Sequence, residues 1–387
     1  MHTIYLDHTA TTPLDPRVLE AMQPYFGDRF GNASSAHRYG RQAKDALEEA
    51  RARIAVAIGA KPAEVIFTSG GTESDNIAIL GVLKPARRRH RNHLLTEAAE
   101  HHAVLDTCLH LRDEGVDVAV LGVDQHGSVA AKAVEEGLRP ETALVTIMHA
   151  NNEVGTIQPI AEICRIARAR GVPVHTDAVQ SIGKIPLHVD DLGVHLLTIT
   201  AHKINGPKGI GALYIRRETE WEPVFHGGGQ ERGRRPGTEN VSLAVGFAAA
   251  VGLATEEREI MMPRVERLRD SLQRQLQDAF PGMVVNGHPD RRLPHLLSVS
   301  FDSRVMPMEG EMLIANLDLE GIAASSGSAC TSGSVQPSHV LLAMGREERT
   351  AKATVRFSFG RGNSEDDVAV VKEAMQRIVA RMHRAAQ

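Results

Sequence analysis

The chain has 387 residues, of which 42% are hydrophobic and 24% are charged, and its formal net charge is −4. At about 100–200 residues per domain, this length favours two domains. The slight excess of acidic residues argues against a general nucleic-acid binder. No apolar run reaches the roughly 18 residues of a membrane-spanning helix, so we expect no membrane partner. The start lacks the basic-then-apolar order of a secretory signal, and a complete mature chain is expected.

Cysteine is scarce, with Cys108, Cys164 and Cys330 as the full set. Three thiols cannot form a disulfide framework, and no Cys-x-x-Cys pair is present to seed a zinc site. This usage favours a reducing, cytoplasmic location. Cys108 and Cys164 lie in segments of helical pattern, where a buried cysteine acts as a small hydrophobic residue. Cys330 lies in a run of small residues, which predicts a movable loop, although an exposed thiol can also be incidental.

In the first two thirds of the chain, apolar runs of strand length alternate with segments of helical period. The spacing of Ala43, Leu47 and Ile54 predicts a helix that stops at Gly59. Further helices are predicted from Glu73 and over 159–170. Strands are predicted over 65–68, 93–96, 143–148, 172–177, 196–200 and 210–215. This alternation predicts an α/β fold, with a mostly parallel sheet covered by helices on both faces.

The last third has a different pattern. Residues 255–280 are predicted to be helical, with Pro263 kinking or restarting the helix, and we place the change of domain there. A strand over 296–301 and a final helix capped by Ser364 follow. Short strand-like runs mixed with helices predict a smaller α+β unit.

Three features stand at predicted strand ends, where open parallel sheets bind ligands. Ser69-Gly70-Gly71-Thr72 separates a strand from a helix, so it can cradle a phosphate, although a plain turn is an equally good interpretation. Asp177 ends the strand predicted over 172–177. Its carboxylate can be a helix N-cap or the partner of a protonated ring nitrogen. Lys203 follows a third strand, either as an exposed lysine or as an amine nucleophile.

Together, these three features are what pyridoxal 5'-phosphate (PLP) requires. The helix N-terminus suits its phosphate, the carboxylate suits its pyridine nitrogen, and the lysine amine suits its aldehyde. A catalytic metal is not expected, because no set of histidines and cysteines has the spacing of a ligand site.

Motifs along nearly the whole chain support a more specific interpretation. The chain resembles the PLP-dependent cysteine desulfurases, in particular the group whose active-site loop reads Ser-Ser-Gly-Ser-Ala-Cys, here 325–330. The other matching blocks are 5–13, 31–37, 69–76, 100–103, 151–155, 175–180, 201–203, 227–232, 235–240 and 356–358.

The resemblance implies the fold of the large aminotransferase-like (fold type I) PLP enzymes. A large cofactor domain would span 15–256, and a smaller domain would combine 1–14 with 257–387 and carry the cysteine loop. The resemblance also implies a homodimer with active sites at the interface, where Thr238 would reach the cofactor phosphate of the neighbouring subunit.

The resemblance implies a role for each matching site residue. Lys203 would bind the cofactor as a Schiff base, Asp177 would pair with its pyridine nitrogen, and His101 would stack on its ring and move the thiol proton. Arg356 with Asn152 would bind the substrate carboxylate, and Cys330 would be the nucleophile. Further cofactor contacts are implied for Gly71, Thr72, Asn152, Gln180, Thr200 and His202.

The implied reaction converts L-cysteine to L-alanine and leaves a persulfide on Cys330. The sulfur would pass to an acceptor protein, either an iron–sulfur scaffold or a tRNA-thiolation enzyme, with no direct contact to nucleic acid. Two alternatives remain open at this point. One is a related PLP enzyme, such as a selenocysteine lyase or an aminotransferase. The other is a catalytically silent assembly or sulfur-relay protein that keeps only the fold.

Overall fold

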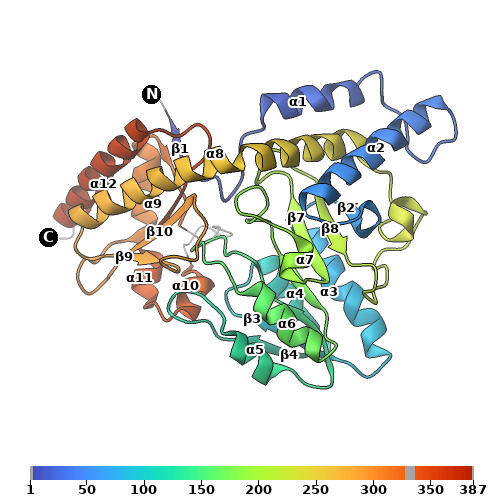
Figure 1. Ribbon diagram of the computed structural model, residues 1–387. Helices are drawn as coiled ribbons and strands as arrows, with labels where there is room; N and C mark the ends of the chain where they lie inside the picture. The colour runs from blue at the N-terminus through green and yellow to red at the C-terminus, as the bar shows by residue number, and fades with distance from the viewer. Residues whose placement is uncertain (1–2, 327–335, 386–387) are drawn as a thin grey trace.

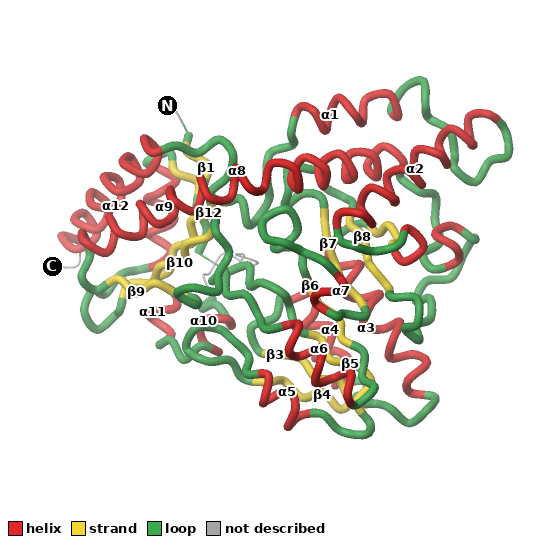
Figure 2. Tube along the Cα trace, viewed as in Figure 1, coloured by secondary structure: helices red, strands yellow, loops and turns green. Residues whose placement is uncertain are grey.

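A computed structural model of the chain describes residues 3–326 and 336–385. Cys330 and the residues around it lie outside the described part. Within the described residues, seven strands form one large sheet (Figures 1 and 2). Their order in space is β2 (Val65–Thr68), β8 (Gly211–Ile215), β7 (Leu196–Thr200), β6 (Val174–Asp177), β5 (Thr142–Thr146), β3 (His93–Glu97) and β4 (Asp117–Leu121).

The pairing confirms the predicted, mostly parallel sheet. Strands β4, β3, β5, β6 and β7 are parallel to one another, and only β8 runs against its neighbours β7 and β2. All five residues of β7 are buried, as expected for a strand covered on both faces. Because the parallel strands end at the same edge, the residues that follow β2, β3, β6 and β7 gather there.

Helices cover both faces of this sheet. Helices α3 (Gly71–Arg87) and α4 (His102–Asp113) share one apolar cluster with the strands. A larger cluster on the other face includes side chains of α2, α5, α6 and α7. The bounds of these helices and of the short elements around them are α1 (Pro16–Met22), η1 (Gln23–Tyr25), α2 (Arg38–Ala57), η2 (Pro62–Glu64), α5 (Ala131–Gly137), α6 (Ile160–Ala169), α7 (Val189–Leu192) and η3 (Gln230–Gly233).

A separate apolar cluster holds the C-terminal part together with the first residues of the chain. Strands β9 (Met283–Asn286), β10 (Leu296–Phe301) and β12 (Thr354–Ser358) form an antiparallel sheet. Strand β1 (Ile4–Tyr5) pairs with β11 (Ile322–Ala323), so the N-terminal segment contributes to this cluster. The helices of this part are α9 (Gly310–Leu319), α10 (His339–Ala343), α11 (Glu348–Lys352) and α12 (Glu365–Ala385).

One long helix, α8 (Val241–Ala279), runs from the large sheet to the C-terminal part (Figure 1). The helix extends well before the predicted 255–280, and Pro263 lies inside α8 without restarting it. Residues 241–251 contribute to the large cluster and residues 265–276 to the C-terminal cluster. We therefore propose that the domain boundary, at 256/257, falls within α8. Across the described residues, no helix combines the length and the apolar character needed to cross a membrane.

Candidate active site

Lys203 lies just beyond the end of β7 and reaches toward the N-terminal segment. Its Nζ donates to the carbonyl oxygens of Thr9 and Ala10, the latter at 2.7 Å. Desolvation, followed by the positive charge of Arg356, lowers the pKa of Lys203 to about 8, against the opposing effect of Asp177 and Asp7. A substantial fraction of this amine is therefore neutral near pH 7–8, as a nucleophilic lysine requires.

Asp177 ends β6 at the same edge of the sheet and is 8% exposed. Its Oδ1 accepts from the Val179 backbone N–H at 2.8 Å and closes a turn. No helix of the described chain begins there, so the helix N-cap interpretation was wrong. Burial raises the pKa of Asp177, and the charges of His101 and Lys203 oppose that rise. A cation bound beside this carboxylate would restore its ionised form, which fits a protonated pyridine nitrogen.

The Ser69-Gly70 turn leads from β2 into α3. The N–H groups of Ser69 and Gly70 bond with the Glu73 carboxylate and the Thr68 hydroxyl, so the candidate anion donors are the first N–H groups of α3 itself. Gly70 has φ of 156° and ψ of −173°, a conformation that essentially only glycine adopts. No side chain among the described residues caps α3, and its first N–H groups therefore form a site for an anion such as a phosphate. Gly211 of β8 keeps this turn close to the sheet, since a Cβ there would lie 2.8 Å from the Gly70 carbonyl carbon.

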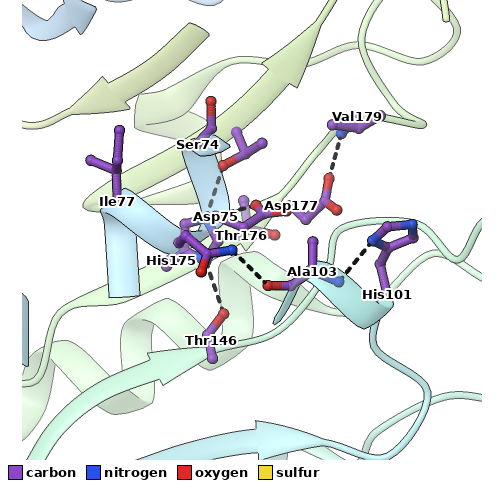
Figure 3. A network of polar contacts seen from close by, with 12 residues as sticks. Ser74, Asp75, Ile77, His101, Ala103, Thr146, His175, Thr176, Asp177 and Val179 are labelled. Atoms are coloured by element: carbon purple, nitrogen blue, oxygen red, sulfur yellow. Dashed lines mark hydrogen bonds and ion pairs between the residues drawn. The ribbon is translucent and has the colours of Figure 1, made fainter. Parts of the chain in front are cut away.

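His101 begins α4 next to this edge. Its Nδ1 accepts from the Ala103 backbone N–H at 3.1 Å (Figure 3). Desolvation lowers the pKa of His101, the Asp177 charge opposes this and the Lys203 charge adds to it. The imidazole is therefore mainly neutral at pH 7, and because Nδ1 accepts a hydrogen bond, its one proton lies on Nε2.

Arg356 reaches the same region from β12 of the C-terminal part. Its Nη2 donates to Asp7 Oδ1 at 2.9 Å, and its Nη1 donates to the Asn152 carbonyl oxygen at 3.0 Å. Its Nε is buried without a hydrogen-bond partner among the described residues. The guanidinium is thus oriented by Asp7, whose role sequence reasoning missed, and it brings positive charge to this region.

Of the next four predicted residues, two are buried at this edge of the sheet and two are exposed. Gln180 is 5% exposed, and its Nε2 donates to the Thr9 carbonyl oxygen at 3.0 Å, next to Lys203. The Thr200 hydroxyl donates to the Ile210 carbonyl oxygen at 2.9 Å, a bond that phosphate binding would have to replace. Thr72 is exposed in the first turn of α3, and Thr238 is exposed in the loop before α8.

His202, between β7 and Lys203, is half-buried. Its Nδ1 bonds with the Thr11 hydroxyl at 3.1 Å, and its carbonyl oxygen accepts from the N–H and the hydroxyl of Thr12. Desolvation and then the charge of Lys203 lower the pKa of His202 to about 4. The ring is therefore a neutral hydrogen-bonding group at pH 7.

A buried polar network lies beneath Asp177 (Figure 3). On the same strand, the His175 ring bonds with the Thr146 hydroxyl at 2.8 Å and the Thr198 hydroxyl at 3.1 Å, and its Nε2 lies 3.5 Å from Asp75 Oδ1. Burial lowers the pKa of His175 to about 3, so the ring is neutral. Burial and then the charge of Asp177 raise the pKa of Asp75 well above its usual range.

Two further carboxyl groups are buried nearby, at the end of β3 and just before His101. Glu97 and Glu100 are both 0% exposed, and no carboxyl oxygen of either makes a hydrogen bond of good geometry among the described residues. Burial raises the pKa of Glu97 to about 8. Burial and the neighbouring Glu97 charge raise the pKa of Glu100 well above its usual range. Both side chains therefore hold a proton at neutral pH.

Sequence reasoning assigned no role to Asp75, His175, Glu97 or Glu100. A signal was present for His175, which precedes Asp177 by two residues on a strand and therefore shares its face. Buried acids in a helix or at a strand end have no comparable pattern, because the same residue types are common on surfaces.

The two described cysteines are unsuited to nucleophilic chemistry. Cys108 and Cys164 are 0% and 1% exposed, as predicted for structural cysteines. Burial raises the pKa of each thiol to about 12. Since the thiolate is the reactive form, neither can serve as a nucleophile at neutral pH.

Comparison with known proteins places this arrangement in a family. The aminotransferase class-V family matches residues 4–371. The putative cysteine desulfurase IscS 1 of Bacillus subtilis strain 168 is 46% identical over 383 residues, covering 99% of this chain and 100% of the relative. A solved NifS-like protein superposes with a TM-score of 0.91 at 38% identity, covering 98% of this chain and 100% of the other. The solved SspA superposes with a TM-score of 0.80 at 37% identity, covering 92% and 99%.

The chain therefore belongs to the aminotransferase class-V family of fold type I, PLP-dependent enzymes. Within that family it falls into the cysteine desulfurase group, which confirms the resemblance that the sequence motifs indicated.

Proposed function

We propose that this enzyme converts L-cysteine to L-alanine and transfers the sulfur to Cys330 as a persulfide. The observation that carries the proposal is the meeting of Lys203, Asp177, His101 and the N-terminus of α3 at one edge of the sheet, with Arg356 facing them from the C-terminal part. The SspA structure, solved in complex with cysteine, supports the substrate.

The residues at this edge fit PLP by their chemistry. Asp177 would pair with the ring nitrogen, Lys203 would bind the aldehyde carbon, and His101 would lie against the ring. The first N–H groups of α3, with Thr72, Thr200 and His202, would bind the phosphate, and Gln180 and Asn152 would lie near the phenolic oxygen. Bound PLP supplies the electron-withdrawing group that makes the Cα–H and Cβ–S bonds of the substrate labile.

Arg356 would orient the substrate. Asp7 and the Asn152 carbonyl oxygen fix the guanidinium plane, and the second N–H of each Nη atom would remain for the substrate carboxylate. Because a charge-assisted bond to a fixed guanidinium is directional, it would hold the Cα–H bond toward the Lys203 amine. With its pKa lowered to about 8, Lys203 can hold and return that proton.

The sulfur step balances without an outside oxidant. L-Cysteine and the Cys330 thiol give L-alanine and the Cys330 persulfide: the S–S bond forms, the Cβ–S bond breaks, and Cβ gains a proton. His101, neutral at pH 7, would accept the Cys330 thiol proton at Nδ1, which would have to give up its hydrogen bond from the Ala103 N–H. Cys330 is proposed here because burial suppresses the thiolate form of Cys108 and Cys164.

The setting of the reaction belongs to the same proposal. The enzyme would act as a cytoplasmic homodimer in which Thr238 of each subunit reaches the cofactor phosphate of the other; the exposure of Thr238 supports this. The names of the IscS relatives and the similarity to the NifS-like protein support delivery of the sulfur to an acceptor protein, either an iron–sulfur scaffold or a tRNA-thiolation enzyme.

The test is alanine and sulfide production from L-cysteine with a thiol reductant. We expect one alanine per sulfide, and a loss of more than about 10³-fold in Cys330→Ala and in Lys203→Ala. Lys203→Ala should also lose the visible absorption that PLP acquires on the enzyme. Lys208→Ala, which removes an exposed lysine five residues along, is the matched control and should keep both properties.

Other outcomes would contradict the proposal. Cys330→Ala that retains the wild-type rate would show that Cys330 is not the nucleophile. Turnover confined to selenocysteine, or dependent on an amino-group acceptor, would indicate one of the related PLP enzymes. Wild-type protein that takes up no PLP would indicate a catalytically silent member of the family.

A further inference from the structure

A cavity of about 60 Å³ lies beside Lys203, next to the stretch of α8 that connects the two apolar clusters. It is large enough for a few water-sized groups. Segments far apart in the sequence supply its polar lining: His8 after β1, Lys184 after β6, and His295 before β10. The reaction proposed above uses none of these three residues.

His295 is the least satisfied of them. It is 1% exposed, and neither ring nitrogen has a hydrogen-bond partner among the described residues. A buried polar group without a partner is costly, so native proteins usually provide a water or an ion for it. His295 lines the cavity, which is where such a partner would bind.

Lys184 is a buried amine without a counter-charge. It is 7% exposed, and its Nζ makes one long hydrogen bond of 3.4 Å to Gln180 Oε1. Among the described residues, no carboxylate forms an ion pair with it. Desolvation and then the charge of Lys203 lower the pKa of Lys184 to about 7. An anion next to this amine would favour its charged form.

The acidic groups near the cavity already have partners. Glu257 of α8 lines it, but its carboxylate contacts Arg17 at 2.8 Å and also Arg361. Asp7, which precedes His8, pairs with Arg356 at 2.9 Å.

The other charged side chains that face the cavity, Lys203, Arg258 and Arg361, are basic. Desolvation and then the charge of Lys184 lower the pKa of both His8 and His295, and His8 lowers that of His295 further. The site therefore has hydrogen-bond donors and positive charge in excess of negative charge.

We propose that Lys184, His295 and His8 form a binding site for one small monovalent anion, of the class of chloride or hydrosulfide. A volume of about 60 Å³ suits an ion of the size of chloride or hydrosulfide. The apolar part of the lining, with Met261, Met262 and Phe359, favours an ion that gives up its water easily.

The site can be tested on the holoenzyme without turnover. The melting temperature is measured while sodium gluconate is replaced by chloride, or in a second arm by hydrosulfide, at constant ionic strength. For wild type, we expect a saturable rise in the melting temperature. The rise should be larger below pH 7, because Lys184 is then protonated. The arm with the lower half-saturating concentration identifies the preferred anion. Lys184→Met and His295→Asn should lose the saturable rise, and Lys132→Met, on the exposed surface of α5, should retain it.

Crystals of the holoenzyme soaked in bromide give the location. We expect an anomalous peak within the cavity in wild type and none there in His295→Asn. If Lys184→Met fails to fold, the His295→Asn comparison decides alone. A rise that does not saturate, an equal rise in all variants, or bromide peaks confined to the surface (an adventitious ion only) would overturn the proposal.

Discussion

Two sets of buried ionisable residues in this molecule differ in their partners: one set forms ion pairs and the other has none among the described residues. On the α2 side, Arg51 forms two hydrogen bonds with Glu231, at 2.6 and 2.8 Å, and both side chains are at most 3% exposed. Glu231 also accepts from the Phe67 backbone N–H at 2.9 Å. Beneath the active site, the carboxyl groups of Glu97 and Glu100 are equally buried but have no such partners among the described residues.

The difference determines which of these groups are ionised in the folded protein. The Arg51–Glu231 pair ties α2 and β2 to the Gly-rich loop before α8, and Glu231 adopts a left-handed φ of 48° there. The opposite charges of Arg51 and Glu231 compensate each other at every pH at which both groups are ionised. Glu97 and Glu100 instead avoid charge by retaining protons, so the active-site region depends on pH and the paired region does not.

The largest expected effect comes from breaking the paired set. Arg51→Met leaves the Glu231 carboxylate buried without its cation, and we expect a loss of about 3–5 kcal/mol in the free energy of unfolding. Arg53→Met, which breaks the exposed Arg53–Glu49 pair on the same helix, should lose less than about 1 kcal/mol. Denaturant unfolding of the two variants measures the contrast. Equal losses of unfolding free energy in the two variants would show that breaking the buried pair costs no more than breaking the exposed pair.

A smaller effect is expected at the unpaired set, and it depends on pH. Because folded Glu97 keeps its proton up to about pH 8 while the unfolded chain releases it near 4.5, the folded state binds more protons between these values. The free energy of unfolding should therefore fall as pH rises through this window, by up to about 1.4 kcal/mol per pH unit for this group.

Glu97→Gln removes the titrating proton and should flatten that dependence. Unfolding of the variant and the wild type, measured in parallel at several values from pH 5 to 8, checks the difference in slope. Glu49→Gln, at an exposed position, serves as the control and should retain the wild-type slope. Identical slopes in wild type and Glu97→Gln would mean that Glu97 is ionised in the folded protein.

The smallest effect concerns reactivity alone. With pKa values of about 12, Cys108 and Cys164 have a thiolate fraction of about 10⁻⁴ at pH 8, compared with about a quarter for a free cysteine. We expect iodoacetamide to alkylate them at least about 10³ times more slowly in the native protein than after denaturation. Peptide mass spectrometry resolves the sites. Rapid labelling of either cysteine in the native protein would contradict its burial.

Much of the fold could be predicted because strands covered on both faces are continuous apolar runs, such as 65–68 and 196–200. The strand-end rule then indicated Asp177 and Lys203. Helix α8 was predicted too short because its first part is rich in alanine and glycine and lacks a polar face.

The Asp7–Arg356 contact joins residues 349 positions apart, which no local pattern reveals. Arg51 was also missed, because a charged residue on an amphipathic helix is usually exposed. Glu97 and Glu100 were missed for a related reason: burial sets their protonation, and burial depends on the packing of several elements. Cys330 was indicated by the sequence, and its placement lies outside the described residues.

The most direct test of the proposed chemistry is a mass measurement on the holoenzyme after one equivalent of L-cysteine without reductant. We predict that the peptide containing Cys330 gains one sulfur atom, that Cys108 and Cys164 gain none, and that alanine appears in equal amount. Alanine formed while Cys330 remains unmodified, or sulfur found on Cys108 or Cys164 instead, would contradict this account.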